Sequence, residues 1–76
     1  MKIIYNSRPE FVELQKSIAQ MEYSMLILLG EGDDDNFTIE FSECVSEDFG
    51  CRLYLPYFIK SPSGGLIKSC VFNVAR

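Results

Sequence analysis

The sequence predicts an α+β domain of two layers, in which one N-terminal helix packs on a four- to five-stranded, mainly antiparallel sheet. Three observations lead to this prediction. One segment near the N-terminus has the apolar spacing of a helix, later segments alternate apolar and polar residues as half-buried strands do, and short polar segments separate them. The expected element order is β-α-β-β-β-β, and we expect a single domain over residues 1–76.

The first strand and the start of the helix follow from the N-terminal residues. Segment 1–6 is rich in β-forming side chains and predicts a short strand. Segment Ser7–Glu10 matches a capping box, in which the serine hydroxyl accepts a hydrogen bond from a backbone N–H and the glutamate reaches back. Pro9 suits the first helical turn, where its missing N–H has no cost. We therefore expect the helix to begin at Arg8.

Helical spacing then continues for about four turns. Apolar residues recur three or four positions apart, at Phe11, Leu14, Ile18 and Met21. Such a stripe covers one face of a helix and needs a sheet to pack against. The sequence therefore predicts a helix over residues 8–22. A strand that follows this helix favours a parallel arrangement with the first strand, through a right-handed crossover.

A hairpin is expected next. Met25–Leu29 is apolar at every position and is followed by Gly30, which predicts a central strand. Glu31–Asn36 combines glycine, carboxylates and asparagine, as loops do. Phe37–Phe41 alternates apolar and polar residues, as a half-buried strand does. Strand, loop and strand together predict a hairpin that carries acidic residues at its tip.

Two further strands complete the expected sheet. Residues 52–59 alternate, so that Leu53, Leu55, Tyr57 and Ile59 share one face while Tyr54, Pro56 and Phe58 share the other. Because proline cannot donate to a ladder, this strand is expected at an edge or with a bulge at Pro56. Residues 61–65 predict a turn, and residues 66–74 predict the last strand. In it Cys70, Phe72 and Val74 point inward, with Lys68 at the same parity.

Composition narrows the class of protein. The longest apolar run falls far short of the roughly 20 residues that a membrane helix needs, and the N-terminal segment lacks the apolar core of a secretion signal. We therefore expect a cytoplasmic protein with no membrane contact. The chain has an odd number of cysteines, namely Cys44, Cys51 and Cys70. It has no histidine, and no two of these cysteines form a C-x-x-C pair. This favours reduced thiols over a zinc site, with a Cys44–Cys51 bridge only under oxidising conditions.

Charge in this chain is sorted by position. The net charge is −4, and between residues 19 and 51 every charged residue is acidic, whereas between residues 52 and 76 every charged residue is basic. Fields of one sign act on partners more than on the fold. Across a sheet, however, the regions of Glu40 and Arg52 are expected to approach each other, and pairing there would neutralise the middle of the field.

Catalysis and cofactor binding find little support in the sequence. The chain has no histidine, and its Gly64-Gly65 pair lies between predicted strands rather than before a helix, where a phosphate loop would lie. The acids at Asp33–Asp35 suggest a calcium site, but the spacing departs from the helix–loop–helix motif. We therefore expect no enzyme, no cofactor and no dedicated metal site, and keep weak calcium binding as an alternative.

The leading hypothesis is a non-enzymatic module that binds a protein partner with a basic surface. With more acids than bases, the chain is poorly suited to direct nucleic-acid binding, but a carboxylate array can occupy a basic groove on a partner. By analogy of size and charge alone, the chain resembles small acidic inhibitors of phages and mobile elements, including anti-CRISPR and nucleic-acid-mimicking proteins. The expected recognition acids and steering field are Glu31, Asp33, Asp34, Asp35, Glu40, Glu43, Glu47 and Asp48.

Two aromatic residues complete this hypothesis, because one helix covers only one face of a sheet. Tyr54 and Phe58 then lie on the other face, where aromatic side chains commonly anchor an interface. The alternative is a homo-oligomeric structural or accessory protein, in which the apolar sheet face joins the copies and the acids only solubilise. The sequence leaves a homodimer and a hetero-partner equally open.

Overall fold

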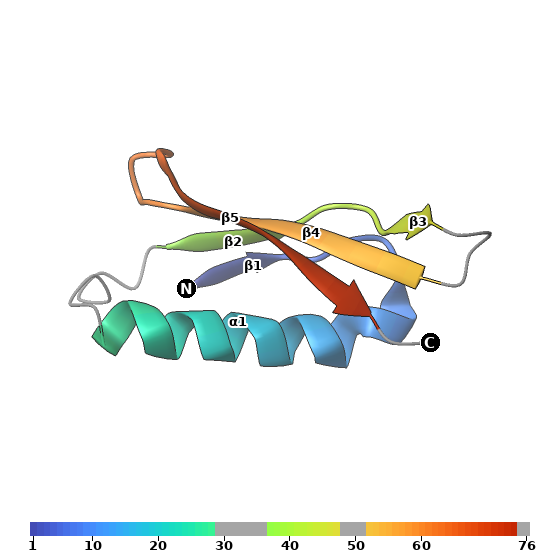
Figure 1. The fold of residues 1–76 in the computed structure, drawn as a ribbon. Coiled ribbons are helices and arrows are strands. Elements are labelled where there is room, and N and C mark those ends of the chain that lie inside the picture. Colours follow the sequence, from blue (N-terminus) through green and yellow to red (C-terminus); the bar gives the residue numbers. More distant parts are fainter. Residues whose placement is uncertain (29–36, 48–51, 75–76) are drawn as a thin grey trace.

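A computed structural model describes residues 1–28, 37–47 and 52–74 of the chain. One helix packs against a mixed five-stranded sheet, which confirms the two-layer α+β fold (Figure 1). The elements in chain order are β1 (Lys2–Ile4), one 3-10 turn (Pro9–Phe11), α1 (Val12–Leu28), β2 (Thr38–Phe41), β3 (Val45–Glu47), β4 (Arg52–Lys60) and β5 (Leu66–Val74).

Strand β4 lies at the centre of the sheet. It pairs antiparallel with β5 along one edge, and with β2 and then β3 along the other. Strand β1 extends the sheet beyond β2 and runs parallel to it, from Lys2 beside Thr38 to Ile4 beside Glu40. A strand–helix–strand unit therefore joins β1 to β2 as expected, and the remaining pairings are antiparallel.

The core lies between α1 and the sheet face that β4 dominates. Leu55 has no exposed surface, and the other inward positions of β4 are buried with it, as the alternation in the sequence predicts. Ile18, Ala19 and Leu26 cover them from the helix, at positions that share one helical face. Burial of a large aliphatic side chain contributes about 1.5–3 kcal/mol, so this layer is the main apolar contribution to stability.

Pro56 lies in the central strand, not at an edge of the sheet. Phe41 pairs with Tyr57 and Val45 pairs with Tyr54, so residues 42–44 face only residues 55 and 56. One extra residue on that side is a bulge between β2 and β3. Ser42 N–H donates to the Pro56 carbonyl at 2.9 Å. Pro56 has no N–H to donate to the opposing strand, and the bulge lies at this position. The edge alternative is thus wrong, and the bulge lies opposite Pro56, in the segment between β2 and β3, rather than in β4 itself.

The expected strand over Met25–Leu29 is wrong for the residues that the structure describes. Helix α1 continues to Leu28, six residues beyond the expected end. An apolar run alone does not distinguish a buried strand from a helix, and methionine and leucine are good helix formers. Leu26 is buried because it lies on the same helical face as Ile18, whereas Leu28 is 85% exposed.

Two consequences follow for the expected topology. The acidic segment Glu31–Asn36 connects a helix to β2, so it is not the tip of a hairpin, and its residues lie outside those that the structure describes. Strand β3 was not expected, because it has only three residues in a polar stretch. The order β-α-β-β-β-β is nevertheless confirmed, with β3 in the place of one strand that proves helical.

The expected capping box is also wrong. The Ser7 hydroxyl donates to Glu43 Oε2 at 2.8 Å, and no side chain caps the 3-10 turn. Pro9 does occupy the first turn, as expected. The Arg8 N–H instead donates to Asn6 Oδ1 at 3.0 Å, so Asn6 holds the start of the 3-10 turn. Helix α1 begins at Val12, after this turn, and not at Arg8 as expected.

A buried amide network connects this helix start to the sheet. Gln15 has no exposed surface, and its Oε1 accepts from the Asn6 N–H at 2.9 Å while its Nε2 donates to Asn6 Oδ1 at 3.2 Å. Asn6 Nδ2 in turn donates to the Ser42 carbonyl at 3.2 Å, beside the bulge. Buried amides stabilise only when they are hydrogen-bonded, so this network fixes where α1 enters the domain.

The hairpin between β4 and β5 agrees with the sequence prediction. Gly64 has a φ of +91°, a conformation that favours glycine, and its N–H donates to the Ser61 carbonyl at 2.9 Å. In β5 the residues at even positions point toward the helix, and Val74 is buried. Within the described residues, no helix combines the length and apolarity needed to cross a membrane.

We predict that Leu55→Ala destabilises the fold by about 2–5 kcal/mol, because it opens a cavity in the layer between β4 and α1. Urea unfolding followed by circular dichroism measures this change. Leu28→Ala, the same substitution at a position of α1 that is 85% exposed, serves as the control and is expected to change stability by less than about 1 kcal/mol. Equal losses in both variants would contradict the described core.

Candidate functional site: the helix-free face of the sheet

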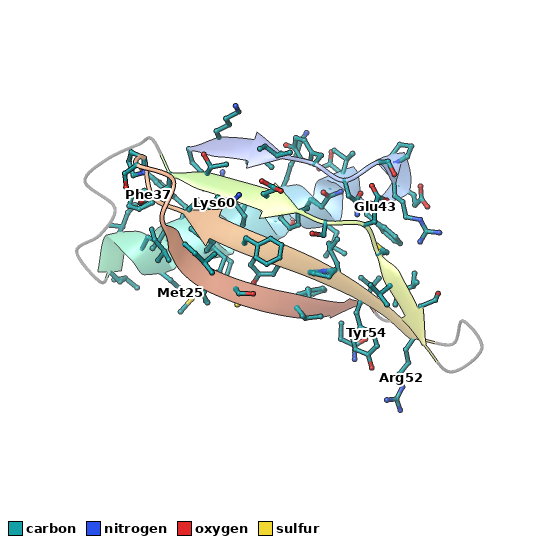
Figure 2. All side chains as sticks on the ribbon, turned by 90° about the horizontal axis from the view of Figure 1, so that it is seen from above. Met25, Phe37, Glu43, Arg52, Tyr54 and Lys60 are labelled. Atoms are coloured by element: carbon teal, nitrogen blue, oxygen red, sulfur yellow. The ribbon has the colours of Figure 1, made fainter. Side chains whose placement is uncertain are left out.

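The sheet face opposite α1 carries no helix among the described residues, and we call it the helix-free face (Figure 2). Strand alternation assigns side chains to it, because residues paired across strands share a face. Its members are Lys2 and Ile4 from β1, Thr38 and Glu40 from β2, Val45 from β3, Arg52, Tyr54, Pro56, Phe58 and Lys60 from β4, and Ser69, Val71 and Asn73 from β5.

Tyr54 and Phe58 both lie on this face, as expected. Tyr54 pairs with Val45 of β3 on one side and Asn73 of β5 on the other, whereas Phe58 pairs with Glu40 and Ser69. Both aromatic side chains are half-buried, while Val45 is 50% exposed. Four residues apart on one strand, the two rings are spaced by roughly 13 Å along β4. They therefore give a partner two anchor points joined by Pro56.

The acids predicted as a steering field are partly compensated within the fold. Lys60 Nζ lies 3.3 Å from Glu40 Oε1 across the β2–β4 pair, on the helix-free face. The backbone of Glu47 pairs with that of Arg52 in the β3–β4 register. Glu40 is therefore paired across the sheet with Lys60 and not with the expected region of Arg52, and this pairing reduces its field. An exposed pair of this kind contributes at most about 1 kcal/mol to stability.

Glu43 serves a different contact. Its carboxylate accepts from both the backbone N–H and the hydroxyl of Ser7, at 3.3 and 2.8 Å. The contact ties the bulge between β2 and β3 to the segment before the helix, and Figure 2 shows Glu43 at that end of the molecule. Of the other predicted recognition acids, Glu31, Asp33, Asp34, Asp35 and Asp48 lie outside the described residues.

A buried polar cluster lies on the opposite face, beneath the helix, and sequence reasoning missed it. Glu22 of α1 is 3% exposed, and its Oε2 accepts from Lys68 Nζ at 2.8 Å. Its Oε1 accepts from the Tyr57 hydroxyl and from Lys68 Nζ, both at 3.1 Å. The alternation of the last strand placed Lys68 among the inward-facing residues, which indicated that it needs a buried partner. That partner, Glu22, lies 46 positions away in the sequence, so local spacing does not identify it.

This cluster shifts the acid–base behaviour of its members. Hydrogen bonding to Glu22 raises the pKa of Lys68, since the charged ammonium is the form that the carboxylate stabilises. Burial raises the pKa of Tyr57, with the negative charge of Glu22 acting in the same direction. Both groups are therefore held protonated, and the three side chains satisfy one another. We interpret the cluster as a structural link between α1, β4 and β5.

The described thiols do not form a site of their own. Cys44 lies between β2 and β3, whereas Cys70 lies in β5, and both are free and half-buried. Cys51 lies outside the described residues, so the expectation of a Cys44–Cys51 bridge under oxidising conditions does too. Within residues 1–28, 37–47 and 52–74, no three metal-ligating side chains gather where they could hold an ion.

Sequence reasoning missed part of the helix-free face. Val45 was missed because β3 was not expected, and Ile4 was assigned no face because the short first strand shows no alternation. Val71 could have been found, since it shares the parity of Ser69 and Asn73, which were expected to point outward. No protein-family model, curated protein or solved structure matches this chain.

We predict that Lys68→Met destabilises the fold by about 2 kcal/mol, because Glu22 is left charged and buried with only a tyrosine hydroxyl. Breaking a fully buried pair costs about 3–5 kcal/mol, and the lysine side chain here is partly exposed. The double variant Glu22→Gln with Lys68→Met removes the stranded charge and is expected to recover part of the loss. Urea unfolding measures both, and a double variant no more stable than Lys68→Met would contradict the charge argument.

We predict that stability falls as pH rises above about 10. The folded state raises the pKa of Tyr57 and Lys68 above their ordinary values of 10.0 and 10.5, so in that range it binds more protons than the unfolded state. Their contribution is fully present below pH 10 and is lost as pH rises through the raised pKa values. Urea unfolding at pH 8, 10 and 11 checks this, with Tyr57→Phe expected to show a shallower fall. A constant stability to pH 11 would contradict it.

Proposed function

We propose that this chain is a non-enzymatic protein-binding module that docks on a partner through the helix-free face of its sheet. The observation that carries the proposal is the pair of half-buried rings Tyr54 and Phe58, which share that face with the exposed side chains of Val45 and Val71. Apolar and aromatic groups that lie together on an uncovered surface are typical of interfaces. A partner that covers them would remove this apolar surface from water.

The charge of the chain supports a partner with a basic surface. The net charge is −4, and a negative field steers a basic surface toward the chain and speeds association. Glu40 and Glu43 are engaged within the fold, so they contribute less to this field than the sequence suggested. We therefore expect attraction to the basic surface to depend chiefly on Glu31 and Asp33–Asp35, with Glu47 and Asp48 adding to the field.

Within this class, we favour an inhibitor that occupies a nucleic-acid-binding surface. Lysine- and arginine-rich grooves bind phosphates by releasing counterions, and a rigid domain with clustered carboxylates competes for the same groups. The support for this mode of action is an analogy of size and charge with small acidic anti-defence proteins, anti-CRISPR proteins among them. Binding is then expected to weaken with salt and to be reversed by added nucleic acid.

We predict that Asp33→Asn with Asp34→Asn weakens partner binding about 10-fold, since each exposed ion pair contributes up to about 1 kcal/mol. The tagged chain captures its partner from a lysate of the source cells, and titration of the purified partner then measures affinity at several salt concentrations. Glu10→Gln with Glu13→Gln is the matched control, because it removes the same charge from the exposed first turns of the helical segment. Tyr54→Ala is expected to weaken binding more strongly, by roughly 30-fold.

Three results would contradict this proposal. The first is a partner that binds both double variants with equal affinity and equal salt dependence. The second is a partner whose binding is unaffected by Tyr54→Ala, although circular dichroism shows that the variant is folded. The third is a partner that binds the chain and its nucleic acid at the same time, which would exclude occupation of a nucleic-acid groove.

A further inference from the structure

Strand β5 forms a long outer edge of the sheet. It has nine residues and pairs with β4 on one side, and no described strand pairs with its other side. The opposite edge, β1, has only three residues. Long unpaired edges are templates for another strand, and proteins usually protect them with charge, proline or a bulge.

The hydrogen bonds of β4 determine which residues of β5 direct their backbone outward. Ser42 donates to the Pro56 carbonyl, so Pro56 directs its backbone toward β2 and β3. Successive residues of a strand direct their backbone N–H and carbonyl groups to opposite sides, so Tyr57 directs its own groups toward β5. Ser61, of the same parity, does donate to the Gly65 carbonyl on that side at 2.8 Å.

The pairing register then identifies the free backbone groups of β5. Tyr57 pairs with Cys70, so Cys70 is bonded to β4 and its neighbour Val71 directs its N–H and carbonyl to the outer edge. By the same alternation, Ser69 and Asn73 also direct their backbone outward. These three residues carry their side chains on the helix-free face, where Val71 is 62% exposed.

This edge lacks the usual protection by charge. Lys68 is the single charged residue among the nine of β5, and its ammonium is held by Glu22 on the helix side. The outward residues Ser69, Val71 and Asn73 are uncharged. The outer edge of β5 is therefore neutral, although the chain has a net charge of −4. It offers no acid to a basic partner, and two copies meet no like charges there.

We propose that two copies of this chain pair antiparallel through β5, about a twofold axis at Val71. In that register Val71 lies opposite Val71 of the second copy, and Ser69 lies opposite Asn73, so three residues on each side exchange backbone hydrogen bonds. Such a contact is self-complementary, as a twofold interface requires. The two five-stranded sheets become one continuous sheet, with both helix-free faces on the same side.

The helix side of β5 fits the same register. Cys70 comes opposite Phe72 of the second copy, and both side chains are half-buried in the single chain. Met25 of α1 is 45% exposed and lies on the β5 side of the molecule in Figure 2. A second copy brings apolar surface to both places. Val71 also lies on the helix-free face, but the dimer pairs through the backbone edge of β5 and so does not rest on the proposed function.

Disulfide crosslinking tests the register directly. In the proposed dimer the Cα atoms of the two Val71 residues are about 5.5 Å apart, which suits a disulfide. The two Asn73 residues are offset by four positions, or roughly 14 Å, which does not. Under mild oxidation, most of the Val71→Cys chain is therefore expected to become a covalent dimer on a non-reducing gel, whereas Asn73→Cys and the unmodified chain, with its three native cysteines, remain monomeric.

Light scattering over a concentration series tests the association itself. The unmodified chain is expected at twice its 8.7 kDa mass. Val71→Lys is expected to raise the dissociation constant on the order of 100-fold, since it places two like charges opposite each other, whereas Val71→Thr keeps the dimer. The inference is overturned by a monomer at all concentrations, by a dimer that Val71→Lys leaves intact, or by equal crosslinking of the two cysteine variants.

Discussion

The structure depends on strand β4, because every other antiparallel strand hydrogen-bonds to it and its inward side chains form the centre of the core. β2 and β3 follow one edge of this strand and β5 follows the other, so an error in the register of β4 would misplace the whole sheet. A one-residue slip would move Leu55 from the core to the helix-free face. Pro56 is compatible with this central place only because the bulge between β2 and β3 lies opposite it.

Two polar residues on the buried side of α1 determine how the helix is seated on this sheet. Gln15 binds Asn6, which lies between β1 and the helix, and Glu22 binds Tyr57 and Lys68. Apolar contacts alone permit a helix to slide, whereas buried hydrogen bonds are directional and costly to leave unmade. The helix is therefore held near its start by an amide network and near its middle by a charged one.

The same arrangement separates the surfaces that are available for binding. Lys68, which would have protected the edge strand, is used by Glu22 within the fold, and Lys60 is used by Glu40 on the helix-free face. Both lysines are thus held in ion pairs with acids of the same chain. This leaves a neutral edge at β5 and an aromatic face at Tyr54 and Phe58, two surfaces of different chemistry on one small sheet.

The sequence by itself determined the fold class, the alternation of β4 and β5, the hairpin turn at Gly64 and the outward place of Tyr54 and Phe58, since these follow from local periodicity and backbone preference. Only the tertiary structure decided that Met25–Leu28 is helical, that Ser7 binds Glu43, and that Glu22 meets Lys68. An apolar run fits a buried strand and a helix equally well until its neighbours are in place. A polar side chain binds the partner that folding brings near it, and that partner here lies 36 or 46 positions away in the sequence.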